Sequence, residues 1–359
     1  MPIPAPLGLR ERVPLAPLTT LGLGGPARWF LRCASPADLR TALAWGRQER
    51  LPVIILGGGS NVIVPDAGLD ALVLQVAIPG VTFAEARQET IVDAGAGVAW
   101  DELVAEAVRR GAAGVECLSG IPGTVGGTPI QNVGAYGQEV AETIVEVRAL
   151  DREALEPCTF TRDECRFAYR GSRFKGEDAG RFVVTGVRFR LQPGGAPTLR
   201  YPELAAAVAT RGGVTGVAPV VGLGRVRETV LALRRSKGMV LDPTDPDTRS
   251  AGSFFMNPVL TPEEFAALGR RWTEGGGSGA IPTFPAPGGL KVPAAWLIER
   301  AGFAKGFALD GARISHRHTL ALVNAGGSTA DLLALATSIR EGVRARFGVT
   351  LEREPVLLA

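Results

Sequence analysis

The stretch from Glu116 to Gly137, ECLSGIPGTVGGTPIQNVGAYG, constrains the fold most, because it has neither helical nor strand periodicity. It carries six glycines, two prolines and one charged residue. Glycine is favoured where the backbone adopts a positive φ or approaches another group closely, although it costs conformational entropy. Its apolar side chains, among them Ile121, Val125 and Ile130, argue against disorder, which requires low hydrophobicity and high charge. We therefore predict a loop that wraps around a ligand.

The composition limits the remaining classes of function. With 359 residues, 46% of them hydrophobic, the chain can form two or three domains with a sizeable core. A net charge of +3 is too small for a nucleic-acid-binding surface. No apolar run reaches the roughly 18–20 residues of a membrane span, and the N-terminus lacks the charged and apolar regions of a signal peptide. We expect a cytoplasmic protein that binds neither nucleic acid nor membrane.

Cysteine and histidine usage excludes further chemistries. The four cysteines have no CxxC spacing, and His316 and His318 are the only histidines in the sequence. Reduced thiols in a cytoplasmic enzyme explain this pattern better than a disulfide framework or a zinc site, so we expect no metal. The shortage of histidine also argues against a Ser-His-Asp hydrolase.

Hydrophobic patterning predicts an α+β fold. Helical spacing after Ser35-Pro36 and in DELVAEAVRR predicts helices over 37–50 and 101–110. Short β-branched runs bounded by turn residues predict strands over 27–33, 53–56, 71–76, 90–95, 145–150 and 182–191.

Two further regions follow along the chain. Residues 202–238 are predicted to be helix-rich, and residues 239–347 to end in a long helix that Ser328 and Asp331 cap. SFFMNP reads as strand-like, and VTLEREPVLL is predicted to form a closing strand.

A second glycine-rich turn interrupts VIILGGGSNVIV. Consecutive N–H groups in such a turn can form a nest that binds anions. It is not a Rossmann fingerprint, because a second strand rather than a helix follows, and a plain hairpin turn is the alternative. Gly95-Ala96-Gly97 and the 116–137 stretch also follow strands, which suggests one extended ligand such as a dinucleotide.

These glycine segments are similar to the flavin domain of the vanillyl-alcohol-oxidase superfamily. With CRFAYRGSRFK, SKGMVLDP, AGSFFMNP and LEREP, the chain from about Thr20 onward resembles more closely the UDP-N-acetylenolpyruvoylglucosamine reductase family. The resemblance implies a two-subdomain FAD-binding region of the PCMH type and a smaller α+β substrate-binding domain. We expect the first at 1–237 (core about 24–192, dividing near 76), completed by 348–359, and the second at 238–347.

The resemblance also implies non-covalent FAD and assigns its contacts to the glycine segments. The expected cofactor contacts are Gly57, Gly58, Gly59, Ser60, Asn61, Gly120, Ile121, Pro122, Gly123, Gly126, Gly127, Gln131, Asn132, Gly134, Ala135 and Tyr136.

Three residues match the family's catalytic groups: Arg170, the proton donor Ser253 and Glu354. Taken alone, CRFAYRGSRFK reads as a strand whose arginine is a solvated charge or part of an ion pair, and a serine in AGSFFMNP as a hydroxyl that caps a strand end. Glu352 and Glu354 would share one face of a strand, where an exposed edge pair is the alternative.

Four further residues match substrate contacts: Tyr169, Tyr201, Lys237 and Asn257. Tyr201 lies in LRYPEL, which resembles the mobile tyrosine loop of the longer family subtype, whereas Lys237 alone would be an ordinary cation at a helix C-terminus. The chain departs from the family at Met256, where members commonly carry lysine.

The implied activity is reduction of UDP-N-acetyl-3-O-(1-carboxyvinyl)-glucosamine to UDP-N-acetylmuramate, a step of bacterial peptidoglycan precursor synthesis. NADPH would reduce the FAD, flavin N5 would deliver hydride to the enolpyruvyl group, and Ser253 would supply the proton. Arg170 and Glu354 would stabilise charge on the substrate carboxylate. A monomer is expected by analogy.

Two other functions compete with this interpretation. An FAD oxidase of the same superfamily often attaches flavin through histidine, and no histidine precedes His316. A non-catalytic nucleotide-binding protein would keep LGGGSN but should lose Arg170, Ser253 or Glu354, all of which are present.

Overall fold

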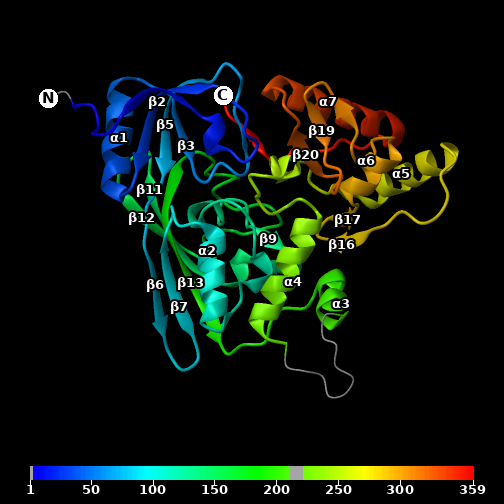
Figure 1. Ribbon diagram of the computed structural model, residues 1–359, viewed down its shortest axis with the longest axis horizontal. Helices are drawn as coiled ribbons and strands as arrows, with labels where there is room; N and C mark the ends of the chain where they lie inside the picture. The colour runs from blue at the N-terminus through cyan, green and yellow to red at the C-terminus, as the bar shows by residue number, and fades with distance from the viewer. Residues whose placement is uncertain (1–2, 211–220) are drawn as a thin grey trace. The chain divides into compact units, whose positions relative to one another are not determined.

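The computed structural model describes residues 3–210 and 221–359, so part of the predicted helix-rich region 202–238 lies outside the described residues. Contacts divide the chain into two compact units (Figure 1). Unit 1 takes its described residues from Met1–Val13, Ala27–Gly59 and Asp70–Val240, and unit 2 from Pro14–Pro26, Ser60–Leu69 and Leu241–Ala359. The predicted domains grouped 348–359 with the N-terminal region, whereas contacts group these residues with unit 2.

Unit 1 is built on two sheets. The first has the strand order β1 (Arg10–Pro14), β2 (Pro26–Cys33), β5 (Leu69–Val76), β3 (Val53–Leu56), with β3 and β5 parallel. Helix α1 (Pro36–Gln48) packs against this sheet. The second has the order β12 (Pro157–Thr161), β11 (Ile144–Asp151), β13 (Phe182–Pro193), β7 (Thr90–Gly95), β6 (Val81–Glu85), and β8 (Ala112–Ala113) also pairs with β13.

Helix α2 (Trp100–Arg109) packs against the second sheet because both elements present an apolar face. Side chains of β7 alternate between buried and half-buried, as a strand with one covered face requires. The buried residues on α2 follow helical spacing: Trp100, Leu103, Val104 and Ala107. The Trp100 ring lies 5.8 Å from the Phe189 ring of β13. One continuous core thus joins the helix to the sheet.

Two further helices and several short elements complete unit 1. Helices α3 (Pro202–Thr210) and α4 (Leu223–Ser236) enclose a small cluster with Cys117, and Figure 1 shows α2 and α4 near each other. The remaining elements are η2 (Glu116–Leu118), η3 (Val125–Gly127), β9 (Gly134–Ala135), β10 (Gln138–Glu139) and η4 (Val140–Glu142).

Unit 2 packs helices on a small antiparallel sheet. The sheet order is β14 (Ser250–Ser253), β20 (Ala321–Asn324), β19 (Ala312–Ile314), β18 (Ala308–Leu309), and the core of the unit includes the apolar stripe of α7 (Thr329–Phe347). Ser328 and Asp331 form the predicted capping box of α7. The other elements are η1 (Ala16–Leu18), β4 (Val62–Ile63), η5 (Pro246–Thr248), β15 (Val259–Leu260), α5 (Pro262–Glu274), β16 (Phe284–Ala286), β17 (Gly289–Lys291), α6 (Ala294–Arg300) and β21 (Val356–Leu357).

Two strand predictions are wrong, and SFFMNP belongs to a strand only at Ser253, where β14 ends. CRFAYRGSRFK forms consecutive turns, because Arg166 and Arg170 both adopt positive φ values, of 49° and 52°, that no strand accommodates. VTLEREPVLL contains only the short strand β21 and one isolated bridge, at Arg353. In both segments the backbone groups are hydrogen-bonded in turns or single bridges instead of a strand ladder. The alternation of apolar residues along the sequence does not predict these hydrogen bonds.

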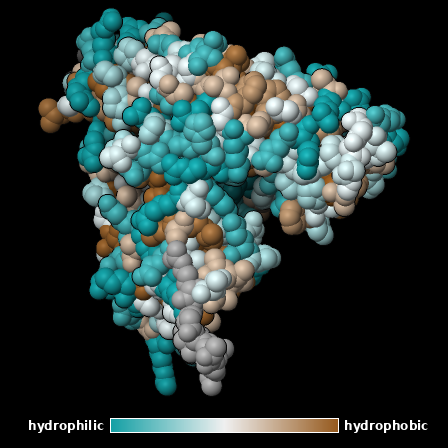
Figure 2. Space-filling view, turned by 45° about the vertical axis from the view of Figure 1, so that its right-hand side comes forward, coloured by the Kyte–Doolittle hydropathy of each residue, from teal (hydrophilic) through white to brown (hydrophobic). Residues whose placement is uncertain are grey.

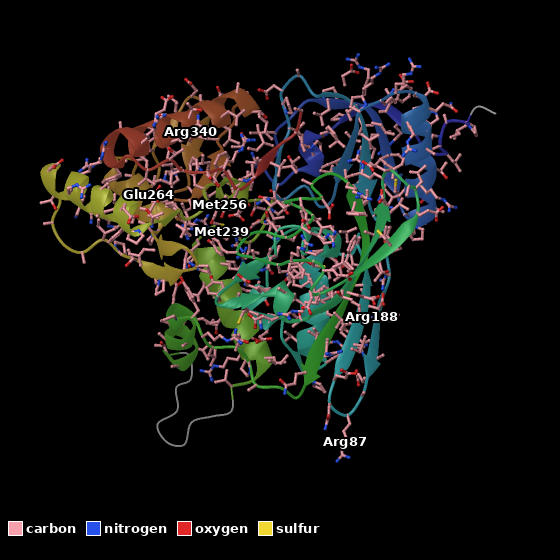
Figure 3. The ribbon with its side chains drawn as sticks, turned by 180° about the vertical axis from the view of Figure 1, so that it is seen from behind. Arg87, Arg188, Met239, Met256, Glu264 and Arg340 are labelled. Atoms are coloured by element: carbon pink, nitrogen blue, oxygen red, sulfur yellow. The ribbon has the colours of Figure 1, made fainter. Side chains whose placement is uncertain are left out.

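One face of the molecule and the tip of a hairpin show the character of the surface. The face drawn in Figure 2 is largely hydrophilic with apolar residues interspersed, and Figure 3 shows Arg87 projecting from the tip of the β6–β7 hairpin. Within the part of the chain that is described, every helix falls short of the length or the apolar character needed to cross a membrane.

Gly58→Ala should lower the free energy of unfolding by about 1–3 kcal/mol, as overpacking does. A Cβ at this position would lie 2.7 Å from the Gly123 Cα, so one backbone segment must move. Urea unfolding measures the loss. Gly224→Ala in α4 is the control, because its Cβ would meet nothing within 4 Å; equal effects of the two substitutions would contradict the predicted close contact.

Candidate active site

The three predicted glycine turns lie side by side in unit 1. A Cβ on Gly58 would reach the Gly123 backbone, and a Cβ on Gly126 would lie 2.6 Å from the Ala96 Cβ. The Gly126 N–H donates to the Ala96 carbonyl at 2.9 Å, and Gly123 O accepts from the Trp100 N–H at 3.0 Å, which satisfies a free donor at the start of α2. Backbone packs on backbone here, so larger side chains cannot replace these glycines.

The 116–137 loop also uses glycine for its conformation. Gly120 and Gly123 have φ values of 72° and 109°. Tyr136 and Gly137, at 49° and 78°, form the two-residue turn between β9 and β10, a geometry typical of tight hairpins. Gly127 differs, because a Cβ there would meet nothing within 4 Å, which leaves open space beside the loop.

Asp101 anchors this loop to α2 and α4. Its carboxylate accepts the Gly120 N–H at 2.6 Å and both terminal nitrogens of Arg227 at 2.6 and 2.8 Å. Burial alone would raise the pKa of Asp101, but the hydrogen bonds from Arg227 and Gly120 hold it below its usual value. The loop is thus fixed by charge-assisted hydrogen bonds.

Arg234 is a functional candidate that the sequence analysis missed. Its Nη2 donates to the Met239 carbonyl at 2.8 Å, while its Nε is buried and has no hydrogen-bond partner among the described residues. Burial lowers the pKa of this guanidinium. A Cβ on Gly120 would lie 3.5 Å from Nε. A buried cationic donor without an acceptor beside a glycine loop indicates a ligand with acceptor atoms. Arg234 and Arg235 both directly precede SKGMVLDP, and nothing in the sequence distinguishes one from the other.

Arg170 lies against the same loop. Its Nη1 donates to the Gly134 carbonyl at 3.0 Å, and the neighbouring Tyr169 ring is 46% exposed, 5.8 Å from the guanidinium carbon. Ala168 and Gly171 exchange two backbone hydrogen bonds, so Tyr169 and Arg170 form the tip of a tight turn. The structure therefore brings the predicted catalytic arginine onto the predicted cofactor loop.

Tyr136, Tyr201 and Lys237 form one cluster. The two rings meet edge to face at 5.6 Å, and Lys237 Nζ lies 5.7 Å from the centre of the Tyr136 ring. Burial raises the pKa of Tyr136 to about 12. Lys237, the C-cap of α4, also pairs with Glu203 at 2.8 Å, as an ordinary helix-end cation would.

Five further predicted cofactor contacts in the 116–137 loop are half-buried: Ile121, Pro122, Gln131, Gly134 and Ala135.

Unit 2 brings Ser253 and Glu354 into neighbouring segments. Glu354 N–H donates to the Phe254 carbonyl at 2.9 Å, and Phe255 pairs with Arg353 in an antiparallel bridge. Phe254 and Phe255 are buried, while Gly252 has a φ of 75° that bends the chain at Ser253. Ser253 itself is half-buried.

Asn61 joins this part of unit 2. Its Nδ2 lies 3.4 Å from the Glu354 carbonyl, and its own carbonyl accepts the Val356 N–H at 3.0 Å, where β21 runs parallel to β4. Asn257 Oδ1 accepts the Ala294 N–H at 2.8 Å, which caps α6. Met256, labelled in Figure 3, is half-buried and follows β14. Of the predicted site residues, unit 2 therefore holds Ser60, Asn61, Ser253, Asn257 and Glu354, and unit 1 holds the others.

Two family models match the chain. One, described as an FAD binding domain, matches residues 27–154, and the other, described as UDP-N-acetylenolpyruvoylglucosamine reductase, C-terminal domain, matches residues 242–358. Among curated proteins, a UDP-N-acetylenolpyruvoylglucosamine reductase of Thermobifida fusca is 49% identical over 97% of both chains. One of Mycolicibacterium smegmatis is 46% identical over 98% of this chain and 95% of the relative.

A solved structure extends the likeness to the fold. The UDP-N-acetylenolpyruvylglucosamine reductase from Thermus caldophilus superposes with a TM-score of 0.64 at 26% identity, over 98% of this chain and 100% of that chain.

Asp101→Asn should lower the free energy of unfolding at pH 7 by about 1–3 kcal/mol, because the amide is uncharged and its nitrogen cannot accept the second hydrogen bond from Arg227. Since the pKa of Asp101 is lowered by folding, its stabilisation is present above the unfolded value, about 3.9, and is lost as the pH falls through the folded value. Urea unfolding from pH 7 to pH 3 should show the two proteins converging in acid. A constant difference would contradict this role.

Proposed function

The chain belongs to the UDP-N-acetylenolpyruvoylglucosamine reductase family, FAD-dependent oxidoreductases of peptidoglycan precursor synthesis, and we propose that Arg170, Ser253 and Glu354 carry out the reduction. Its α+β fold comprises an FAD-binding domain of the vanillyl-alcohol-oxidase (PCMH) type and the family's C-terminal domain. The observation that best supports the proposed roles is the pairing of 254–256 with 352–354, which sets a partly exposed serine hydroxyl and a carboxyl group in adjacent segments.

The described residues fit an FAD. The packed turns around Gly58 and Gly123 present backbone without side chains, and Gly127 borders open space. The buried Nε of Arg234 offers a cationic donor to an anionic or carbonyl acceptor. When bound, the flavin supplies the hydride of the reduction, which side chains cannot provide. The proposed contacts are 57–61, 120–123, 126–127, 131, 134–136 and Arg234, with NADPH as the reductant.

The three catalytic groups divide two tasks, protonation of a carbon and stabilisation of negative charge. Adding hydride to one carbon of an enol ether leaves the other carbon to be protonated, and Ser253 Oγ is the proposed proton donor. Negative charge then builds on the carboxylate of the substrate, where the Arg170 guanidinium is the proposed stabilising cation. Glu354 assists as a hydrogen-bond donor in its protonated form. A single preorganised donor of this kind contributes roughly 2.7–4 kcal/mol.

The remaining polar groups suit a UDP-sugar. Lys237 offers a cation for a diphosphate, and Tyr169 and Tyr201, exposed by 46% and 44%, offer rings and hydroxyls. Tyr201 supports assignment to the longer subtype. Asn257 can take part through Nδ2, since Oδ1 caps α6. We propose that the protein acts as a cytoplasmic monomer.

The visible spectrum tests the overall reaction. A yellow protein should lose its colour when NADPH is added without air, and regain it when UDP-N-acetyl-3-O-(1-carboxyvinyl)-glucosamine follows. Recovery with oxygen but not with this substrate would favour an oxidase, and a colourless protein that takes up no FAD would rule out both.

Ser253→Ala should separate the two half-reactions. Reduction of the flavin by NADPH should keep its rate within about twofold, whereas reoxidation by substrate should slow about 10²–10⁴-fold, as expected for loss of a general acid. Stopped-flow absorbance measures both rates. Ser278→Ala, at an exposed serine, is the control. Normal reoxidation of the Ser253 variant would eliminate it as the proton donor.

A further inference from the structure

Asn132 lies in the predicted cofactor loop, yet both polar atoms of its side chain contact protein. Its Nδ2 donates to Glu139 Oε2 at 2.7 Å and to the Ala168 carbonyl at 3.1 Å, and its Oδ1 accepts the Ala141 N–H at 3.2 Å. Only 1% of the residue is exposed. The sequence resemblance implied a cofactor contact here, but the side chain has no free polar atom to offer one.

These contacts join three pieces of chain. The Asn132 backbone belongs to the glycine-rich loop, Glu139 and Ala141 to β10 and η4, and Ala168 to the turn that carries Arg170. The Ala168 carbonyl also accepts the Gly171 N–H at 3.1 Å, which closes that turn. One amide group therefore bonds to the base of the turn two residues from the proposed catalytic arginine.

The turn needs such support. Arg170 has a φ of 52°, a left-handed conformation that non-glycine residues adopt only when the surroundings determine it. Two other hydrogen bonds assist: Lys175 Nζ donates to the Arg170 carbonyl at 3.3 Å, and Ser172 Oγ donates to Ile130 O at 2.6 Å. Asn132 belongs to the loop, is almost fully buried, and hydrogen-bonds to the base of the turn through its side-chain amide.

The arginine head is fixed to the same loop. Arg170 Nη1 donates to the carbonyl of Gly134, two residues beyond Asn132. A Cβ on Gly134 would lie 3.5 Å from that nitrogen and 2.8 Å from Glu139 Cγ. Movement of the turn relative to the loop would therefore change both the backbone and the head-group position of Arg170.

We infer that Asn132 is a positioning residue, which holds the Arg170 turn in register with the cofactor loop through its amide group. The inference rests on the proposed catalytic role of Arg170. Its effect should appear in the step that uses Arg170 and not in cofactor retention, because a displacement of about 1 Å at a reacting group can lower a rate about 10²-fold.

Asn132→Gly tests this role with little backbone strain, since the φ of 46° at this position suits glycine. We expect retained FAD, flavin reduction by NADPH within about twofold of wild type, and reoxidation by substrate slowed about 10–100-fold with little change in substrate affinity. Asn132→Asp keeps the acceptor for Ala141 but loses both donors and faces the Glu139 carboxylate. It should be impaired in the same step at least as much.

A double-mutant cycle then assigns the effect. If Asn132 acts through Arg170, adding Asn132→Gly to Arg170→Ala should not slow reoxidation further. Multiplied losses in the double variant, wild-type reoxidation in both Asn132 variants, or loss of FAD in both would overturn the inference. Wild-type reoxidation in Arg170→Ala alone would instead refute the proposed catalytic role on which the inference depends.

Discussion

Direct packing of backbone on backbone in unit 1 is the constraint on which the candidate site depends. The close approach of Gly58 to Gly123, and of Gly126 to Ala96, leaves no room for a Cβ. Because the Gly123 carbonyl also accepts the first N–H of α2, the same contact sets where the helix begins. A surface formed by backbone N–H and carbonyl groups is a suitable lining for a large planar, anionic cofactor.

The charged groups beside that packed backbone are paired at Asp101 but not at Arg234 Nε. Asp101 is satisfied by Arg227 and the Gly120 N–H, so α4 and the loop share a carboxylate anchor. Arg234, two turns further along α4, has a buried nitrogen with no acceptor among the residues that the structure describes. A satisfied pair beside an unsatisfied cation is the pattern expected of a site that completes its hydrogen bonding with ligand.

The corrections share one physical cause. CRFAYRGSRFK alternates like a strand, yet a long-range hydrogen bond from Asn132 and a local one from Lys175 hold Arg170 in a left-handed turn. The LEREP segment forms no strand ladder and makes a single bridge, between Arg353 and Phe255. Local pattern reports intrinsic preference, whereas distant side chains decide which backbone hydrogen bonds are made.

The sequence by itself determined the elements with strong periodicity and the glycine positions. Alternating or helical spacing of apolar residues predicts β7, α2 and the capped α7, because that spacing places the apolar side chains on one face of the element, which is then buried. The family motifs named Arg170, Ser253 and Glu354. Tertiary structure alone decided that Asn132 faces protein, that Asn257 caps α6 and that Arg234 has a buried unpaired nitrogen. Such facts depend on which groups meet across long stretches of chain, and spacing along the sequence does not record them.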